Sequence, residues 1–123
     1  MQETNKKRIL IVDDDPADRK LLRKILNKKY IVTEADNGRK ALDLARNDKP
    51  DLIFLDIMMP MIDGYTTCCA IKEDPLTAEI PVVMCTNLES ELNIRLANEM
   101  GAAGYITKPV YPQEILDRID QFL

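Results

Sequence analysis

The chain has 123 residues, which suits a single domain built around one hydrophobic core. Its net charge of −4 argues against direct binding to nucleic acid, which usually requires a basic surface. No apolar stretch approaches the roughly 18 residues that cross a membrane, and no secretory signal is visible. We therefore expect a cytoplasmic protein without a membrane partner, whose three cysteines are free thiols.

Short apolar runs rich in β-branched residues alternate with longer segments of helical period. The runs predict five strands, at Arg8–Val12, Ile31–Ala35, Asp51–Leu55, Ile80–Cys85 and Gly104–Ile106. A helical segment follows each run, so the chain reads as five βα units in series. This alternation predicts an α/β fold: a doubly wound parallel sheet of five strands in the order 2-1-3-4-5, with five helices. Residues 8–123 would form the domain, and residues 1–7 a flexible N-terminal tail.

Two of the helices carry specific signals. Asp15 is a plausible N-cap for the first, with Pro16 at its first position and an apolar face of Ala17, Leu21 and Ile25. The pattern of the fourth helix runs through four apolar residues and ends at a glycine: Leu88, Leu92, Leu96, Met100 and Gly101.

Five polar residues fall at the carboxyl ends of the predicted strands. They are Asp13 and Asp14 after the first strand, Asp56 after the third, Thr86 after the fourth and Lys108 after the fifth. In an open parallel sheet these ends form the crevice where ligands bind. Crowded carboxylates repel one another, and a hard cation such as Mg²⁺ relieves that repulsion. The set predicts a Mg²⁺ site beside a phosphoryl group.

The chemistry of such a site follows from the residue types. The carboxylate of Asp56 can act as a nucleophile toward phosphorus and form an acyl phosphate. The ammonium of Lys108 offers a positive charge to phosphate oxygens, and the hydroxyl of Thr86 offers a hydrogen bond. Each of these residues is weak evidence alone, and the ordered set is far more specific.

Four segments in order resemble the receiver domain of two-component response regulators. They are ILIVDDDP at 9–16, PDLIFLDIMMPMIDG at 50–64, IPVVMCT at 80–86 and GAAGYITKP at 101–109. The resemblance covers nearly the whole chain and implies a flavodoxin-like fold. It also implies a phosphorylation-dependent signalling switch, which acts only on itself and is not an enzyme toward other substrates.

The resemblance assigns roles to individual residues. Asp56 would be the phosphoacceptor, and Mg²⁺ would be held by Asp13, Asp14, Asp56 and the backbone carbonyl of Met58. Lys108 would contact the phosphoryl oxygens. The switch pair would be Thr86 and Tyr105, and the peptide bond between Lys108 and Pro109 would be cis.

The same resemblance implies the partners. The phosphoryl donor would be a histidine kinase or a histidine phosphotransfer protein, docked near the first helix. A downstream protein or an attached output domain would read a face around Glu91, Arg95, Tyr105 and Arg118, which also suits a homodimer. The sequence does not say whether the chain stands alone.

Three residues depart from the commonest pattern of the family. Asn87 stands where a small residue is usual. Met58 and Leu88, two residues past Asp56 and Thr86, are apolar where side chains can guide the water that attacks the phosphate. We therefore expect slow self-dephosphorylation.

Two alternatives stay open from the sequence. The first is a phosphatase of the haloacid-dehalogenase type, in which Asp13 and Asp15 form a D-x-D motif, although Ala17 replaces the Thr or Val expected there. The second is a degenerate receiver used only for docking, which the complete set of acid, hydroxyl and lysine disfavours.

Overall fold

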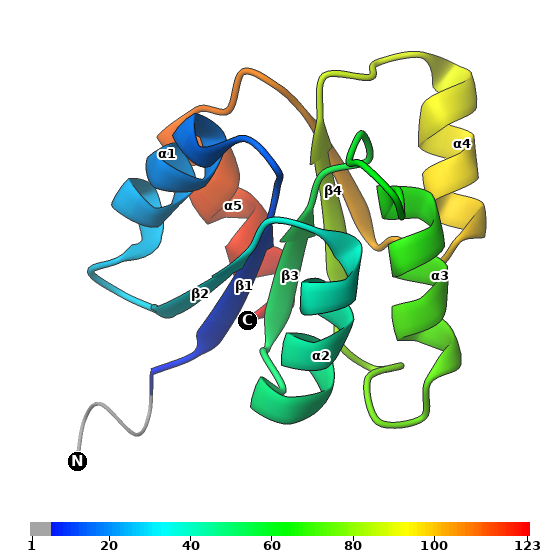
Figure 1. Cartoon of the computed structure of the whole chain (residues 1–123). Coiled ribbons are helices and arrows are strands. Elements are labelled where there is room, and N and C mark those ends of the chain that lie inside the picture. The colour runs from blue at the N-terminus through cyan, green and yellow to red at the C-terminus, as the bar shows by residue number, and fades with distance from the viewer. Residues whose placement is uncertain (1–5) are drawn as a thin grey trace.

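The computed structural model describes residues 6–123 and shows one parallel sheet enclosed by helices (Figure 1). Its elements in chain order are β1 Arg8–Val12, α1 Pro16–Leu26, β2 Ile31–Ala35, α2 Gly38–Asp48, β3 Leu52–Leu55, α3 Gly64–Glu73, β4 Val82–Thr86, α4 Glu91–Glu99, β5 Gly104–Thr107 and α5 Pro112–Phe122. Residues 1–5 of the expected tail lie outside the described part of the chain.

The strand order is β2-β1-β3-β4-β5, and every neighbouring pair is parallel. This confirms the predicted doubly wound sheet. The register is what brings the strand ends together: Val12 pairs with both Ala35 and Leu55, and Thr86 pairs with Thr107. The residues that follow these pairs therefore emerge at one edge of the sheet.

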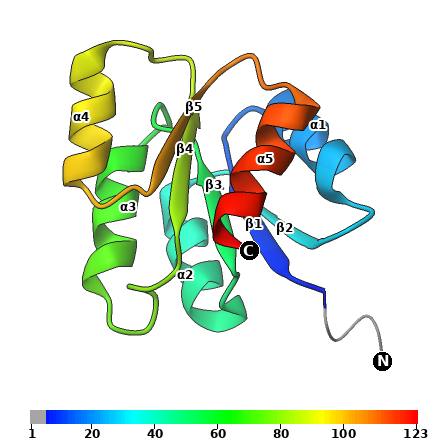
Figure 2. The ribbon, with the colours of Figure 1, turned by 180° about the vertical axis from the view of Figure 1, so that it is seen from behind.

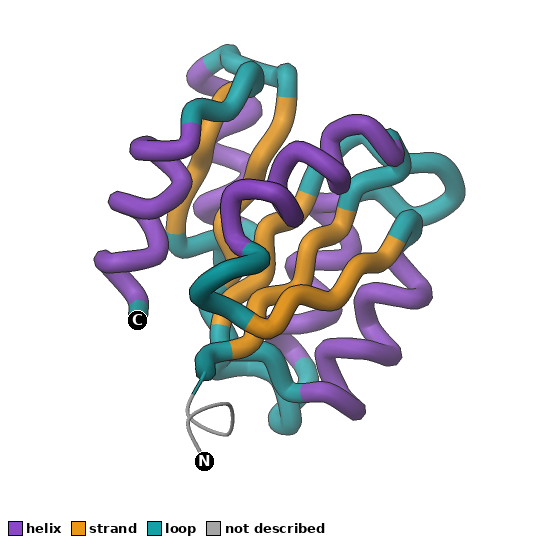
Figure 3. Tube along the Cα trace, turned by 90° about the vertical axis from the view of Figure 1, so that its left-hand side faces the viewer, coloured by secondary structure: helices purple, strands orange, loops and turns teal. Residues whose placement is uncertain are grey.

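The strands bury both faces, because successive side chains point to opposite sides of a sheet. Ile9 and Ile11 pack under α1 and α5, whereas Leu10 and Val12 pack under the layer of α2, α3 and α4. Figure 2 shows α1 and α5 together from behind, and Figure 3 shows helices on both sides of the strands. Burial on both faces explains why the central strands read as continuous apolar runs.

Side-chain caps fix where α1, α2, α3 and α4 begin. The carboxylate of Asp15 accepts a hydrogen bond from the amide of Ala17, which confirms the predicted cap of α1. Asn37 caps α2 and Asp63 caps α3 in the same way. Such caps satisfy amides that have no partner inside the helix.

The apolar face predicted for α1 was wrong at Ala17 and Leu21, whereas Ile25 is half-buried and packs against the core. Leu22 and Leu26 are the buried residues of this helix, while Ala17 is exposed and Leu21 is 42% exposed. A spacing of four residues fits two neighbouring stripes on a helix, and sequence period alone does not say which stripe meets the sheet.

The first residues of α4 and β4 also differ from the predicted ones. Ser90 caps α4, so Leu88 lies in the preceding loop and not in the helix. Strand β4 begins at Val82, because Pro81 has no amide to donate and the amide of Ile80 bonds to the Thr77 carbonyl instead. Among residues 6–123, no helix is long and apolar enough to cross a membrane.

Candidate functional site

Three carboxylates gather where β1 and β3 end. Asp13, Asp14 and Asp56 each offer an oxygen atom, and these atoms lie within 4.8 Å of one another. Asp13 and Asp56 are buried, and Asp14 is exposed. We call these three residues the acidic cluster. Oxygen ligands at this spacing, with one side open to solvent, are suited to a hard divalent cation that keeps several waters.

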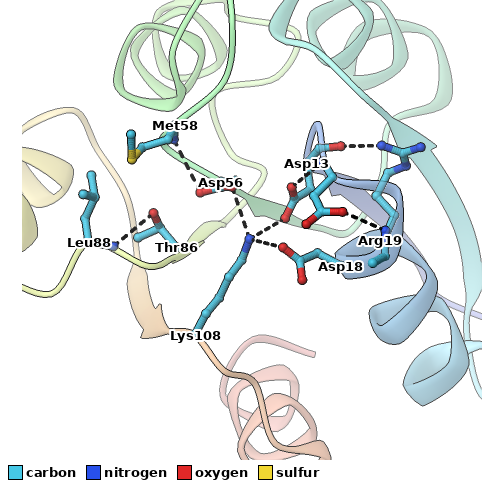
Figure 4. A network of polar contacts seen from close by, with 10 residues as sticks. Asp13, Asp18, Arg19, Asp56, Met58, Thr86, Leu88 and Lys108 are labelled. Atoms are coloured by element: carbon cyan, nitrogen blue, oxygen red, sulfur yellow. Dashed lines mark hydrogen bonds and ion pairs between the residues drawn. The ribbon is translucent and has the colours of Figure 1, made fainter.

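Lys108 carries the positive charge of the site. Its Nζ lies 2.7 Å from Oδ2 of Asp13, 2.7 Å from Oδ2 of Asp18 and 3.2 Å from Oδ2 of Asp56 (Figure 4). The lysine side chain is only 8% exposed. The ammonium therefore neutralises carboxylates that would otherwise repel each other in a largely buried site.

Sequence analysis missed Asp18. It stands on the first turn of α1, and an acid there is also a favourable neighbour of the helix dipole. The only available signal was its place one turn into a helix that starts beside the acidic cluster.

Burial and pairing shift the pKa values at the site in opposite senses. Burial raises the pKa of Asp13, although hydrogen bonds from Lys108 and from the amide of Asp15 work against that rise. Burial also disfavours the charge of Lys108, but hydrogen bonds to Asp13 and Asp18 and the charge of Asp56 outweigh it and raise its pKa. The lysine is therefore charged at neutral pH.

A second network of hydrogen bonds holds the loop after β1, which carries Asp13 and Asp14. Arg19 donates from Nη1 to the carbonyl of Asp13 at 2.7 Å and from Nε to Glu34 at 3.0 Å. Arg23 pairs with the other oxygen of Glu34, and this hydrogen bond lowers the pKa of that carboxyl. Helix α1 and strand β2 thus fix the backbone of Asp13 from outside the acidic cluster.

Thr86 lies near Asp56 and is joined to Tyr105, on β5, through the β4–α4 loop (Figure 4). Thr86 is fully buried, and its Oγ1 accepts from the amide of Leu88 at 3.4 Å (Figure 4). Tyr105 donates its hydroxyl to the carbonyl of Leu88 at 2.5 Å. Burial raises the pKa of Tyr105 to about 12, so the hydroxyl keeps its proton. Among the described residues, the Thr86 hydroxyl makes no hydrogen bond to the acidic cluster or to the Lys108 ammonium, whereas the Thr86 carbonyl accepts one from the Lys108 amide at 2.8 Å.

The loop after β3 sets the position of Asp56. The amide of Met58 points to Oδ1 of Asp56 at 3.4 Å, and the amide of Gly64 donates to the carbonyl of Ile57 at 2.7 Å. The Lys108–Pro109 peptide is cis, the isomer that the resemblance implied. The predicted phosphoacceptor, metal ligands, Thr86 and Lys108 therefore lie at one edge of the sheet, whereas Tyr105 lies within β5 and Glu91, Arg95 and Arg118 lie on α4 and α5. The roles of all these residues stay predictions.

Replacing Lys108 with methionine is expected to lower the free energy of unfolding by about 2 to 4 kcal/mol at neutral pH, because it leaves buried carboxylates without a counter-charge. The pKa of Asp13, which burial already raises, would rise further above its unfolded value, so the loss of stability shrinks as the pH falls through the carboxyl range. Added Mg²⁺ should shrink it as well. Urea unfolding at several pH values, with and without Mg²⁺, measures both effects.

Lys40→Met is the matched control for this loss. Lys40 pairs with Asp36 on the surface, where both side chains are largely exposed. Its removal should cost less than about 0.5 kcal/mol, because exposed ion pairs contribute little. Equal losses in the two variants would show that Lys108 does not neutralise the site as described.

A doubly wound sheet with an acidic cluster, a buried lysine and a buried threonine at its carboxyl edge defines a class of signalling domain. The chain matches the family of the response regulator receiver domain over residues 9–120, and it belongs to that family. Receiver domains of response regulators work in two-component signalling, together with histidine kinases and downstream targets. The family suggested by the four sequence segments is thereby confirmed.

Among its relatives, the chain is 40% identical to the chemotaxis protein CheY of Halobacterium salinarum, over 95% of this chain and 97% of that protein. It is 44% identical to the response regulator PleD of Caulobacter vibrioides, over 84% of this chain but only 23% of PleD. It is 39% identical to the transcriptional regulatory protein ResD of Bacillus subtilis, over 100% of this chain and 50% of ResD. The chain thus spans nearly all of one relative and a half or less of the others.

Solved structures agree with this placement. The chemotaxis protein CheY4 of Vibrio cholerae superimposes with a TM-score of 0.90 at 28% identity, covering 96% of this chain and 99% of that one. The BeF3-activated receiver domain of RstA from Klebsiella pneumoniae gives a TM-score of 0.86 at 35% identity, covering 94% and 97%.

Proposed function

We propose that this receiver domain accepts a phosphoryl group on Asp56 in a Mg²⁺-dependent reaction and thereby changes the surface it offers to a partner. The observation that carries the proposal is the setting of the Asp56 carboxylate. It is buried, lies within 4.8 Å of the oxygens of Asp13 and Asp14, and is 3.2 Å from the ammonium of Lys108.

The chain's own groups suit this transfer. An oxygen of Asp56 forms the new bond to phosphorus while the bond from phosphorus to the donor nitrogen breaks, and the donor leaves with that electron pair. Asp13, Asp14, Asp56 and the carbonyl of Met58 would hold Mg²⁺, which supplies positive charge to the phosphoryl oxygens. Lys108, which directly follows β5, offers a second positive charge to these oxygens. Positioning does most of the rest.

The buried threonine and the tyrosine on β5 provide a route from the site to the surface. The hydroxyl of Thr86 can turn toward a new phosphoryl group, which would release the amide of Leu88. Tyr105 is bonded to the carbonyl of that same leucine, so a shift of the loop changes the packing of the tyrosine. The Thr86 hydroxyl thus has two arrangements, one bonded to the Leu88 amide and one turned toward the phosphoryl group. A charge of roughly −2 on Asp56 would favour the second.

The partners follow from this chemistry. The donor would be a phosphohistidine on a kinase or a phosphotransfer protein, because receiver domains work together with histidine kinases. This chain has no histidine, so it cannot be the histidine-bearing partner itself. The readout face would include Leu92, which is exposed on α4, and Arg118, which donates to the carbonyl of Tyr105. The three cysteines are free thiols, which accords with a cytoplasmic location. The domain would act only on itself and not on other substrates. Neither the phosphatase nor the docking-only alternative is favoured.

Intact-mass measurement after incubation with acetyl phosphate tests the proposal. We expect a single phosphoryl adduct in the presence of Mg²⁺ and none when EDTA replaces it. Equal uptake in the two samples would contradict the metal dependence. No uptake in either would favour the docking-only receiver.

Met58→Asn is expected to speed the loss of the phosphoryl group by about threefold to tenfold, the effect of roughly one hydrogen bond to the attacking water. Met58 is 62% exposed and lines a pocket of about 490 Å³ beside the site, together with Leu88. Neither side chain can orient a water molecule. Decay of the adduct mass over time, after removal of acetyl phosphate, measures the rate.

Met61→Asn is the control for this prediction. Met61 stands in the same loop and is 89% exposed, and asparagine tolerates its left-handed backbone, φ 69°. It does not line the pocket beside Asp56. The adduct of this variant should decay at the native rate, and a Met58→Asn adduct that decays no faster would refute the account of slow hydrolysis.

A further inference from the structure

Asp18 brings a further carboxylate to the site, from a helix and not from a strand end. Its Oδ2 is as close to Lys108 Nζ as that of Asp13, at 2.7 Å, while Oδ2 of Asp56 is 3.2 Å away. Figure 4 shows the three carboxylates converging on the ammonium. Because Lys108 directly follows β5, this contact ties the first turn of α1 to the far half of the sheet.

The ammonium has no donor to spare. A lysine offers three N–H groups, and Asp13, Asp18 and Asp56 account for three acceptors. A phosphoryl group on Asp56 brings new oxygens, and Lys108 can bond to them only by giving up an acceptor it already has. The site therefore contains a competition for one positive charge.

Asp18 is the acceptor that is given up most easily. Its side chain is 33% exposed, compared with 3% for Asp13 and 9% for Asp56. Once phosphorylated, Asp56 is no longer a free carboxylate, and its phosphoryl oxygens, with a charge of roughly −2, can accept more than one N–H group of Lys108. Of the two carboxylates that remain, only Asp18 can turn to water without being unburied. Asp13 is further held by the amide of Asp15 at 2.9 Å.

We propose that Asp18 is an internal competitor for Lys108 that is displaced when Asp56 is phosphorylated. The inference rests on the proposed function, since it requires a phosphoryl group at Asp56. Displacement breaks the ion pair between α1 and the segment after β5, so the event that charges Asp56 also loosens the first turn of α1. Exposed Ala17 and Leu21 belong to that part of the helix. Asp18 is thus a positioning residue that acts through Lys108.

The test is the affinity for beryllium fluoride, which adds to a carboxylate as a phosphoryl mimic, in saturating Mg²⁺. Removing the competitor should strengthen binding, so we expect Asp18→Asn to bind about threefold to fivefold more tightly than the native chain, the range of a partly exposed ion pair. Fluorine NMR titration measures the affinity directly.

Asp15→Asn separates competition from a general effect of charge. Asp15 caps α1, three residues before Asp18, and is exposed, so its replacement removes the same charge from the neighbourhood. Asparagine caps a helix as well as aspartate does, so α1 keeps its start. This variant does not contact Lys108 and should bind beryllium fluoride within about twofold of the native affinity, a smaller change than one ion pair gives.

Amide hydrogen exchange gives a second readout, which charge alone would not move. In the native chain, binding of beryllium fluoride should speed exchange at residues 18–22, because the ion pair between Asp18 and Lys108 is lost. In Asp18→Asn those amides should exchange fast with or without the ligand. Asp18→Ser gives the same expectation and serves if the asparagine variant folds poorly.

Three results would overturn the inference, and they are distinguishable. Equal affinities for the native chain and Asp18→Asn, or exchange at residues 18–22 that slows when the native chain binds the ligand, would show that Asp18 does not compete for Lys108. Failure of the native chain to bind beryllium fluoride in Mg²⁺ would overturn the proposed function, and the inference with it.

Discussion

Asp56→Asn is expected to abolish uptake of the phosphoryl group from acetyl phosphate. The carboxamide has nearly the shape of the carboxylate but is not a nucleophile toward phosphorus. Lys108 would keep its contacts to Asp13 and Asp18, so the ammonium stays paired. The variant should therefore fold normally, and its loss of phosphorylation should be complete by intact mass.

Asp117→Asn provides the comparison for this loss. Asp117 lies on α5, away from the acidic cluster, and accepts a hydrogen bond from Gln113 on the surface. It should be phosphorylated at the native rate. An adduct that persists in Asp56→Asn would move the nucleophile to a neighbouring acid such as Asp13 and would revive the phosphatase reading.

Gly64→Ala is expected to lower the free energy of unfolding by about 3 kcal/mol, because no space is open to the added methyl group. A Cβ at this position would lie 2.2 Å from the carbonyl oxygen of Asp56 and 2.6 Å from the Cα of Ile57. Both are backbone atoms, so the loop itself must move. That movement displaces Asp56, and phosphoryl uptake should slow as well. Chemical unfolding and intact mass measure the two effects.

Gly104→Ala is the matched control. Its Cβ would meet a methyl group of Val83 at 3.4 Å, which is an ordinary contact. Alanine also suits the extended backbone of β5 better than glycine, so stability should hold or rise by up to about 1 kcal/mol. If Gly64→Ala were as stable as Gly104→Ala, the packing of α3 against the Asp56 loop would be misdescribed.

The sheet could be predicted because its signals are local and redundant. Apolar runs such as 52–55 are buried on both faces, and each is followed by a helical segment. The chirality of crossovers then leaves few topologies. Once the order was fixed, the acidic residues after β1 and β3 had to meet, because those strands are neighbours.

What failed depended on tertiary contacts. The stripe of α1 that meets the sheet is set by how the helix lies over β1 and β2, and its sequence fits the stripe of Leu21 nearly as well as that of Leu22. Leu88 continues the helical period of α4, yet its amide and carbonyl are taken by Thr86 and Tyr105. Asp18 could not be assigned to the site either, because its partner lies 90 residues away.

Mapping the phosphoryl group on the native chain tests the central claim most directly. Borohydride reduces an acyl phosphate to an alcohol and so converts the phosphorylated aspartate to homoserine, which peptide mass spectrometry can locate. After incubation with acetyl phosphate and Mg²⁺, we expect homoserine at position 56 alone. Homoserine at position 13, 14 or 18, or at no position, would contradict the assignment of Asp56 as the phosphoacceptor.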